Sequence, residues 1–530
     1  MHTLMKATIK NIFRLAAISA LSFSNSGCKD FLELTPLDTR VEQNFYKTEA
    51  DATEALTSVY DALQWHTNAG GGGFSPDPML SDIASDDAFA GGASRSDSPN
   101  MISVDQHTIS PTNTDLRAHW GNHYTGIYRA NLLLQKLPQI SASDAFKASV
   151  TAQAKFLRAY FYLDLVRFYE NIPLILEPQE SGNYCVVQAT PKMVFDQIAA
   201  DLEQAIPGLP EKMLRDNEGR ATRWAAKALL ARAYLFFHGV YNQDMQAGDI
   251  SVNSQRVLSH LNDVITSSGH DLLDNYADIF KKAFEFSVES VWEISYSDQN
   301  PWYDWNYIQG GEGNMQPLMQ GPRISNDPNY TNGWSFAPVA QQLVDAFEEN
   351  DPRKEATIIS AETDLTGSVT VGYQHTGYFS KKYTTAKEYA PATGTYELNW
   401  GNNYRSIRFS DVLLMAAELE LMTGGGNAQT YYNRVRDRVD MARKTVSLDN
   451  IYQERRVELA LEGQRYWDLL RRGLDVAEQA ITVQNVRGPF YQGDQVDFNV
   501  KFNRATKGFF PIPQSELDLC SGVLKPNTGY

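Results

Sequence analysis

The residue types best suited to ligand chemistry gather in one short segment in the second half of the chain. Residues 301–307 (PWYDWNY) hold four large aromatic side chains, with one carboxylate and one amide between them. Flat aromatic faces pack on the CH faces of sugar rings, and carboxylates and amides bond to sugar hydroxyls. Four large aromatics in one loop cannot all enter a core. We therefore expect about half to fix the loop to the body and the others to bind carbohydrate.

A second loop, residues 65–74, begins with Trp65, His66 and Asn68 and ends in Gly70 to Gly73 and Phe74. This loop is a second candidate site, and Tyr330 and Asn332 are further candidates near the first loop. The predicted ligand-binding residues are Trp302, Trp305, Tyr303, Tyr307, Trp334, Trp65, Asp304 and Asn306.

A run of acids, Ser81-Asp82 and Ser85-Asp86-Asp87, follows the second loop closely. Two interpretations stay open. The acids could bond sugar hydroxyls or a cation, or they could be solvated loop residues that cap helices. The second interpretation is the more common use of such residues.

Signals for metal binding and catalysis are weak. His119 and His123 are four residues apart, a spacing that places two ligands on one helix face, but no third ligand is evident in the sequence. The glycine runs 70–73 and 424–426 lack the Lys-Ser/Thr of a phosphate loop, and no GxSxG nucleophile motif is present. We predict no catalytic residue, no metal and no cofactor, and so no enzyme.

The N-terminus predicts export and lipid anchoring. Three basic residues precede a short apolar stretch at 15–23, and small residues then lead to Cys28. We predict a signal peptide over 1–27 and lipidation of Cys28; the alternative is a plain signal peptide with an incidental cysteine. Cys185 and Cys520 could then pair, which the sequence does not decide.

Composition narrows the class of partner. A net charge of −17 argues against nucleic acid, whose recognition requires basic patches. No stretch after the signal is long and apolar enough to span a bilayer. The body is therefore expected to be held at the membrane by its lipid alone.

Helical periodicity dominates the rest of the chain. The predicted helices pair as antiparallel hairpins with alanine and aromatic residues at their contacts, as in tetratricopeptide-like architectures; the alternative is an ordinary irregular helical domain. Residues 287–296 alternate like a strand, and 298–335 have no helical period. The fold prediction is mainly α with tetratricopeptide-like hairpins, an irregular loop-rich region and minor β. The helices are expected at 41–65, 119–137, 149–169, 190–205, 221–238, 253–267, 337–349, 407–422, 428–442 and 448–472.

Charged residues in the last helices lie in apolar surroundings. Buried charges are costly unless they are paired, so we predict an ion-pair network that locks these helices together. The residues concerned are Arg408, Asp411, Glu418, Arg436, Glu454, Glu458, Glu462 and Arg465.

An ordered set of segments resembles the SusD/RagB outer-membrane lipoproteins of Bacteroidetes. The segments run from the start of the predicted mature chain at Cys28 to the C-terminus at Tyr530. They are CKDFLE at 28–33, TGIYRANLLL at 125–134, AKFLRAYFYLDLVRFYENIP at 154–173, GRATRWAAKALLARAY at 219–234, RFSDVLLMAAE at 408–418, NRVRDR at 433–438, ERRVELALEGQRYWDLLR at 454–471, and FFPIP with PNTGY at the end.

The resemblance implies a SusD-like fold with four tetratricopeptide-like units, in an N-terminal region over 28–285 and a C-terminal region over 286–530. It also implies a lipoprotein exposed at the surface of the outer membrane that captures glycan without cleaving it. Its expected partner is a SusC-like, TonB-dependent outer-membrane barrel. The alternatives are a secreted helical glycosidase, a surface protein that binds a non-glycan nutrient, and a structural surface protein without a small ligand.

Overall fold

The computed structural model describes residues 45–65, 76–179, 182, 184–213, 217–305, 310–486 and 498–530. The predicted signal peptide, Cys28, the loop residues 66–74, Asn306 and Tyr307 lie outside the described residues. None of the described helices combines the length and apolar character needed to cross a bilayer.

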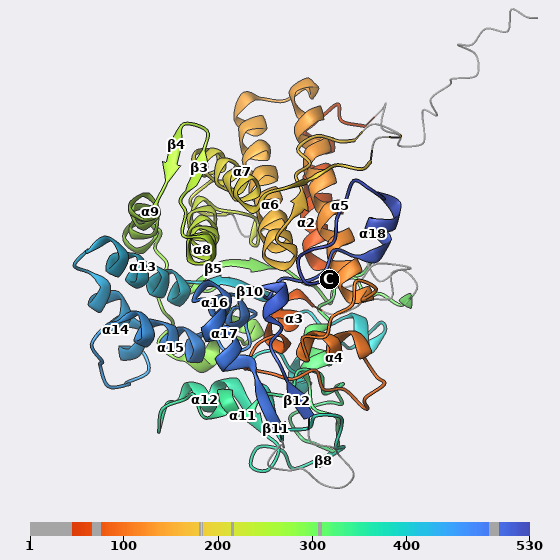
Figure 1. The fold of residues 1–530 in the computed structure, drawn as a ribbon, viewed down its shortest axis with the longest axis vertical. Helices are drawn as coiled ribbons and strands as arrows, with labels where there is room; N and C mark the ends of the chain where they lie inside the picture. The colour runs from red at the N-terminus through yellow and green to blue at the C-terminus, as the bar shows by residue number, and fades with distance from the viewer. Residues whose placement is uncertain are drawn as a thin grey trace, which may run out of the picture.

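The N-terminal half is a stack of antiparallel helices (Figure 1). Its long members are α2 (Glu49–Asp61), α5 (Thr114–Lys136), α6 (Asp144–Tyr169), α7 (Pro191–Ala205), α8 (Arg223–Tyr241) and α9 (Ser254–Ser267). Each begins after a Thr, Asn or Ser whose side chain accepts a backbone N–H of the first turn. Such caps satisfy donors that helix starts leave open. These helices confirm the predicted hairpins.

Small residues let neighbouring helices approach closely. At Gly126 of α5, a Cβ atom would lie 2.4 Å from the Phe161 ring of α6, so glycine is required there. In α8, the alanines at 225, 226, 228, 231 and 233 are buried between neighbours. The sequence prediction of alanine and aromatic contacts is therefore confirmed.

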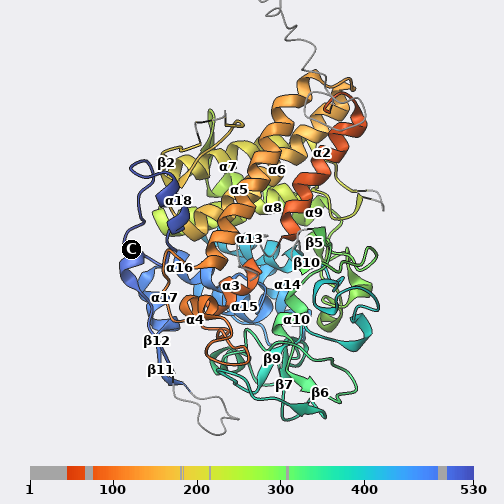
Figure 2. The same cartoon turned by 90° about the vertical axis from the view of Figure 1, so that its right-hand side faces the viewer.

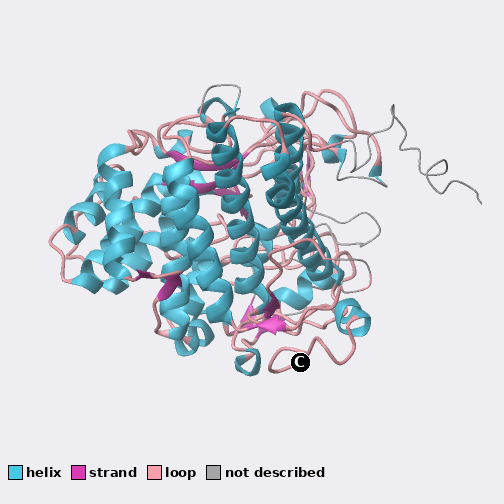
Figure 3. Cartoon of the chain, turned by 90° about the horizontal axis from the view of Figure 1, so that it is seen from above, coloured by secondary structure: helices cyan, strands magenta, loops and turns pink. Residues whose placement is uncertain are grey.

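The middle of the chain is irregular, and its strands form short separate pairs (Figure 3). Strand β5 (Ser290–Ile294) pairs antiparallel with β10 (Tyr404–Arg408), which confirms the strand predicted at 287–296. Figure 2 places β6, β7 and β9 at the end of the molecule opposite the tops of α5 and α6. The remaining strands are β1 (Ile172–Pro173), β2 (Gln188–Ala189), β3 (Met245–Ala247), β4 (Ile250–Val252), β6 (Ile324–Ser325), β7 (Ile358–Ser360), β8 (Ser368–Val369), β9 (Tyr378–Ser380), β11 (Val483–Val486) and β12 (Phe498–Val500).

Two predicted helices need correction. Of 337–349, only α11 (Gln341–Val344) is helical, because residues 337–340 run extended and bond to the backbone of 87–90. The predicted helix 448–472 is two helices, α15 (Leu448–Glu458) and α16 (Arg465–Arg471). The break contains Gly463 at φ +72°, whose N–H donates to Asp82 Oδ1 at 2.9 Å. Both errors arise because contacts with residues 82–90, far earlier in the sequence, override the local helix preference.

Short helices and the late helices complete the described part. The late helices are α13 (Phe409–Thr423), α14 (Ala428–Asp437), α15, α16 and α17 (Leu474–Ile481), and the short ones are α3 (Asp77–Ile83), α4 (Pro99–Asp105), α10 (Gln316–Gln320), α12 (Arg353–Thr357) and α18 (Gln514–Leu519). One hydrophobic cluster contains side chains from α2 through to residue 512. The two halves therefore share a core.

Candidate functional site

Trp302 is the anchored member of the aromatic segment. Its N–H donates to Asn399 Oδ1 at 2.7 Å, and Asn399 Nδ2 donates back to Trp302 O at 2.9 Å. Its indole Nε1 donates to Asp304 O at 3.0 Å, and the ring packs partly against the main core. A Cβ on Gly311 would lie 3.1 Å from Trp302 Cβ. Trp302 therefore fixes the loop to the body, as expected for about half of these aromatics.

Trp305 and Tyr303 point outward instead. Their exposed fractions are 45% and 68%, among the highest for large hydrophobic side chains in the described residues. The Trp305 ring lies nearly parallel to that of Trp334, with centroids 6.4 Å apart and an angle of 17° between planes. The fold thus brings together two tryptophans that are 29 positions apart in sequence.

The backbone around Trp334 is held closely against residues 318–322. Trp334 N–H donates to Leu318 O at 2.9 Å, and Gly333 N–H donates to Pro322 O at 2.8 Å. A Cβ on Gly333 would lie 2.3 Å from Gly321 O, so this approach requires glycine. Trp334 is half-buried and meets Phe336 edge-on at 6.4 Å. A rigid support therefore fixes one ring of the pair.

The polar residues around these rings divide between surface and support. Asp304 and Asn332 are exposed, and Asn332 O accepts a hydrogen bond from the Tyr396 hydroxyl at 3.2 Å. Tyr330 is half-buried and pairs through its backbone with Ala386. Asp304 and Asn332 are thus placed where sugar hydroxyls could reach them, as the sequence predicts.

The second predicted loop starts close to the first. Gln64 Nε2 donates to Ser295 O at 2.6 Å, and Ser297 N–H donates to Glu312 O at 2.7 Å. Trp65 is half-buried, and the Arg129 guanidinium lies 4.6 Å from its ring centroid. The backbone segments that lead into the two loops are therefore neighbours in the structure.

The acids after the second loop are structural. Asp82, Asp86 and Asp87 are buried, at the end of α3 and just beyond it. Arg465 Nε donates to Asp86 Oδ1 at 2.8 Å, and Arg456 Nε donates to Asp87 Oδ1 at 3.0 Å. Burial alone would raise the pKa of Asp86, but Arg456 and Arg465 outweigh it and lower the pKa. The burial of these acids contradicts the interpretation as solvated caps and places them out of reach of a sugar at the surface.

The charged residues of the late helices form the predicted network. Arg408, 1% exposed, donates to Glu289 at 2.6 Å, to Glu458 at 2.9 Å and to Glu462 at 2.8 Å. The same network includes Arg353, Arg436, Arg438 and Glu454, and a neighbouring group joins Arg232, Asp411, Glu418, Arg455, Asp468 and Arg471. The ion-pair prediction is confirmed for these residues, whereas Arg465 pairs with Asp86, outside the late helices.

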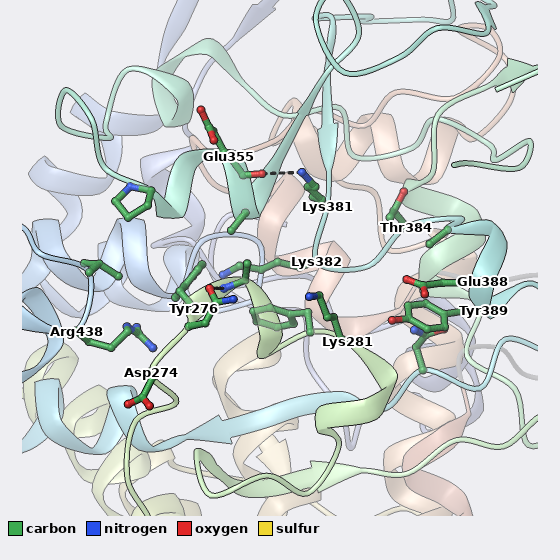
Figure 4. Close-up of a pocket in the computed structure, with 18 of the residues that line it drawn as sticks. Asp274, Tyr276, Lys281, Glu355, Lys381, Lys382, Thr384, Glu388, Tyr389 and Arg438 are labelled. Carbon is green, nitrogen blue, oxygen red and sulfur yellow. Dashed lines mark hydrogen bonds between the residues drawn. The ribbon is translucent and has the colours of Figure 1, made fainter. Parts of the chain in front are cut away.

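A cavity of about 600 Å³ lies beside this network (Figure 4). Its walls include Tyr276, Tyr330 and Tyr389, and Lys381 Nζ on its border donates to Glu355 O at 2.9 Å. Its cations are already paired within the protein: Lys382 with Glu462 at 2.6 Å, and Lys281 with Asp278 at 2.6 Å. The sequence did not reveal this cavity because its lining comes from segments scattered between 274 and 440.

The two remaining cysteines are joined. Cys185 and Cys520 form a disulfide with an S–S distance of 2.09 Å, across a sequence separation of 335 residues. The sequence had left this pairing open. Disulfides persist in oxidising compartments, which agrees with the predicted export of the chain.

Comparison with known proteins gives matches along most of the chain. The family model described as "SusD family" matches residues 288–530, and the model described as "Starch-binding associating with outer membrane" matches residues 30–235. SusD-like protein P25 of Formosa agariphila is 26% identical, over 96% of this chain and 98% of its own length.

Solved structures are similar over the same extent. A "Laminarin binding SusD-like protein" is 34% identical, with a TM-score of 0.78 that covers 92% of this chain and all of that one. Surface glycan-binding protein A from Bacteroides thetaiotaomicron, solved with laminarihexaose, is 30% identical, with a TM-score of 0.80 over 91% of this chain and all of that one. This agreement confirms the predicted mainly helical architecture.

Proposed function

The chain belongs to the SusD family, and from this premise we propose that it captures a glucan of the laminarin type at the cell surface and passes it to a SusC-like, TonB-dependent barrel. Two of its similar structures are named for laminarin or hold laminarihexaose. Its relatives are named for glycan binding and not for cleavage, in agreement with the prediction that the chain is not an enzyme.

The observation that carries the proposal is the pair formed by the exposed Trp305 and the half-buried Trp334. Nearly parallel indoles 6.4 Å apart offer a broad apolar surface. A tryptophan exposed by 45% has no use in the core, and exposed aromatic surface marks a binding site. The CH faces of glucose would lie on the rings, with Asp304 and Asn332 available to the hydroxyls.

The affinity should be modest. Each stacking contact contributes little, and ordering a flexible oligosaccharide opposes binding. We therefore expect dissociation constants between roughly millimolar and micromolar, or about −4 to −8 kcal/mol. Weak capture suits a protein that must release its ligand to a transporter.

Calorimetric titration of the purified protein with laminarihexaose tests the proposal, with maltohexaose as an α-linked comparison. We expect binding of the first, and its loss when the two exposed rings of the loop, Tyr303 and Trp305, are both changed to Ala. Tyr184→Ala, at a side chain exposed by 62% in the loop of the disulfide, is the matched control and should bind normally. Unchanged binding by the double variant would place the site elsewhere. Absence of binding to any glycan would favour a nutrient of another class.

Delivery requires anchoring and a partner. With Cys28→Ala we expect a folded protein that leaves the membrane fraction, because the body depends on packing and not on lipid. We further propose that the helical hairpins form the contact with the barrel, since the aromatic surface must stay open to ligand. Cross-linking from Tyr128 on α5, exposed by 49%, should capture the barrel, whereas cross-linking from Tyr303 should not. The reverse pattern would contradict this arrangement.

A further inference from the structure

Three potential metal ligands converge between α3 and α5. His119 and His123 lie one turn apart on α5, both buried, with ring centroids 4.1 Å apart. Asp77, the first residue of α3, faces them: its Oδ1 lies 3.8 Å from His119 Nε2 and its Oδ2 lies 3.5 Å from His123 Nε2. The three donor atoms all lie within 4.8 Å of one another. The sequence shows only the histidine pair, and the fold supplies the third ligand.

Hydrogen bonds fix which nitrogen of each ring is free. His123 Nδ1 lies 2.8 Å from His119 O, and a carbonyl only accepts, so this nitrogen carries the hydrogen. The Tyr169 hydroxyl donates to Leu116 O at 2.7 Å, so it accepts from His119 Nδ1 at 3.2 Å. In the neutral rings the Nε2 lone pair of His119 therefore faces the Asp77 carboxylate, and that of His123 faces both Asp77 and Asp164. Metal-binding histidines are oriented by the same kind of Nδ1–H contact.

The arrangement is unsatisfied without a cation. His119 Nε2 is buried and has no hydrogen-bond partner among the described residues. A lone pair that faces a carboxylate is repelled unless a positive charge lies between them. Phe168 stacks on the other face of His119 at 4.1 Å, so the ring cannot turn freely to water.

Water can reach one edge of the cluster. A cavity of about 30 Å³ is lined by Asp77 and Asp164 but not by the two histidines, and it can hold one water molecule. The Asp77 side chain is 31% exposed, which gives solvent access. Asp164 Oδ2 lies 3.5 Å from His123 Nε2, and Asp164 is also paired with Arg167, which balances its charge.

We propose that Asp77, His119 and His123 bind one divalent transition-metal ion, of which Zn²⁺ fits best, with water completing the coordination. Two imidazole nitrogens and one carboxylate suit zinc, whereas Ca²⁺ and Mg²⁺ prefer oxygen ligands alone. Tetrahedral ligands about 2.1 Å from zinc lie roughly 3.4 Å apart. The 3.5 and 3.8 Å distances run to different oxygens of Asp77, and the three donor atoms lie within 4.8 Å of one another, so they must close by at most about 1.4 Å to bind one ion. The ion would join the start of α3 to α5, independently of glycan binding.

The alternative to a bound metal ion is a proton on His123. A protonated His123 between Asp77 and Asp164 would suit the same distances. That cluster would hold no zinc at micromolar concentration, so the two interpretations separate in one titration.

The test is calorimetric titration of the purified protein with Zn²⁺, after EDTA treatment and dialysis and with any polyhistidine tag removed. We expect one Zn²⁺ per chain with micromolar or tighter affinity, a higher melting temperature with zinc, and no binding of Ca²⁺ at this site. Co²⁺ should give the visible absorption of a nitrogen-ligated site. A dissociation constant weaker than about 100 µM, near −5.5 kcal/mol, would overturn the proposal.

Variants locate the site. Asp77→Asn keeps the shape of the side chain and should weaken Zn²⁺ at least tenfold without changing the melting temperature in EDTA. Asp61→Asn, at a similarly half-buried carboxylate paired with Arg129 at 2.8 Å, should bind zinc normally. If Asp77→Asn melts lower in EDTA, His123→Gln is judged by the same loss of zinc. Equal zinc binding by the wild type and both cluster variants would overturn the proposal.

Discussion

Arg408 and Trp305 both belong to the C-terminal half, yet the structure uses them in opposite ways. Arg408 is charged and 1% exposed, whereas Trp305 is apolar and 45% exposed. Arg408 is enclosed by Glu289, Glu458 and Glu462, which neutralise it inside the core. Trp305 meets Trp334 at the surface, where neither ring is fully covered.

The difference shows how to separate scaffold from site in this molecule. A dense group of buried charges resembles an active site, but each of these charges has a partner within the protein. An exposed aromatic pair has polar neighbours and an open face. From this comparison we propose that the buried ion pairs stabilise the fold and that Trp305 and Trp334 bind ligand. Separate variants test each role.

The largest effect is expected from Arg408→Met. Removing this cation leaves three buried carboxylates without one of their partners, and breaking a buried ion pair costs about 3–5 kcal/mol. The free energy of unfolding, measured by urea titration, should fall by that amount. Arg504→Met, at an exposed Arg that pairs with Asp475 and Glu478, is the control and should leave the midpoint unchanged. If Arg408→Met were as stable as the wild type, the ion-pair network would not contribute to the stability of the fold.

The second prediction concerns acid. Burial alone would raise the pKa of Glu458, but Arg438, Arg408 and Arg353 outweigh it and hold the pKa well below its usual range. The pKa of Asp468 is lowered in the same way by Arg455 and Arg471. Carboxylates with a depressed folded pKa stabilise the protein above their unfolded pKa near 4, and that stability is lost as pH falls further.

Unfolding free energy should therefore decline below pH 4 by up to about 1.4 kcal/mol per pH unit for each such carboxylate. Glycan affinity should stay constant from pH 8 to 5, because indole rings do not titrate. Urea titrations at each pH, together with calorimetry, measure both. A glycan affinity that changes across this range would show that a group titrating between pH 5 and 8 contributes to the site.

The sequence predicted the scaffold well because its signals are local. Helix periodicity lies within one element, so α7 to α9 begin and end within three residues of their predictions, whereas α5 and α6 begin five residues earlier than predicted. Buried charge in apolar helices also predicted the network. The errors fall where distant segments override local preference: Gly463 breaks a helix because Asp82 accepts its N–H, and residues 337–340 extend along 87–90.

For the proposed binding surface, the sequence indicates a region and not individual residues. Aromatic density marked 301–307, but only the fold separates the anchored Trp302 from the exposed Trp305. The pairing of Trp305 with Trp334 depends on the contact between Gly333 and Gly321, which no local pattern encodes. The third ligand of the histidine pair, Asp77, was missed for the same reason.

The third prediction tests the aromatic side of the comparison. Trp305→Ala should lower the affinity for laminarihexaose at least tenfold, about 1.4 kcal/mol, with an almost unchanged melting temperature. Trp334→Ala should lower the affinity similarly and also reduce stability, because its ring packs against Phe336. Calorimetry and thermal unfolding measure both quantities. A large loss of stability in Trp305→Ala would show that this ring belongs to the core.

The smallest effect is expected at Trp65, which combines the two roles. Its ring lies under the Arg129 guanidinium at 4.6 Å, and its half-buried position leaves part of a face open. Trp65→Ala should cost about 1 kcal/mol of stability through the lost cation–π contact. It should also weaken glycan binding only about threefold, or about 0.6 kcal/mol, less than Trp305→Ala.

Trp65→Phe retains an aromatic face and should restore most of the affinity. Arg129→Met removes the cation but not the ring, so it should lower stability while affinity stays within twofold. If Arg129→Met and Trp65→Ala weaken binding equally, Trp65 acts only through its packing, and the ligand surface is confined to the loops that carry Trp305 and Trp334.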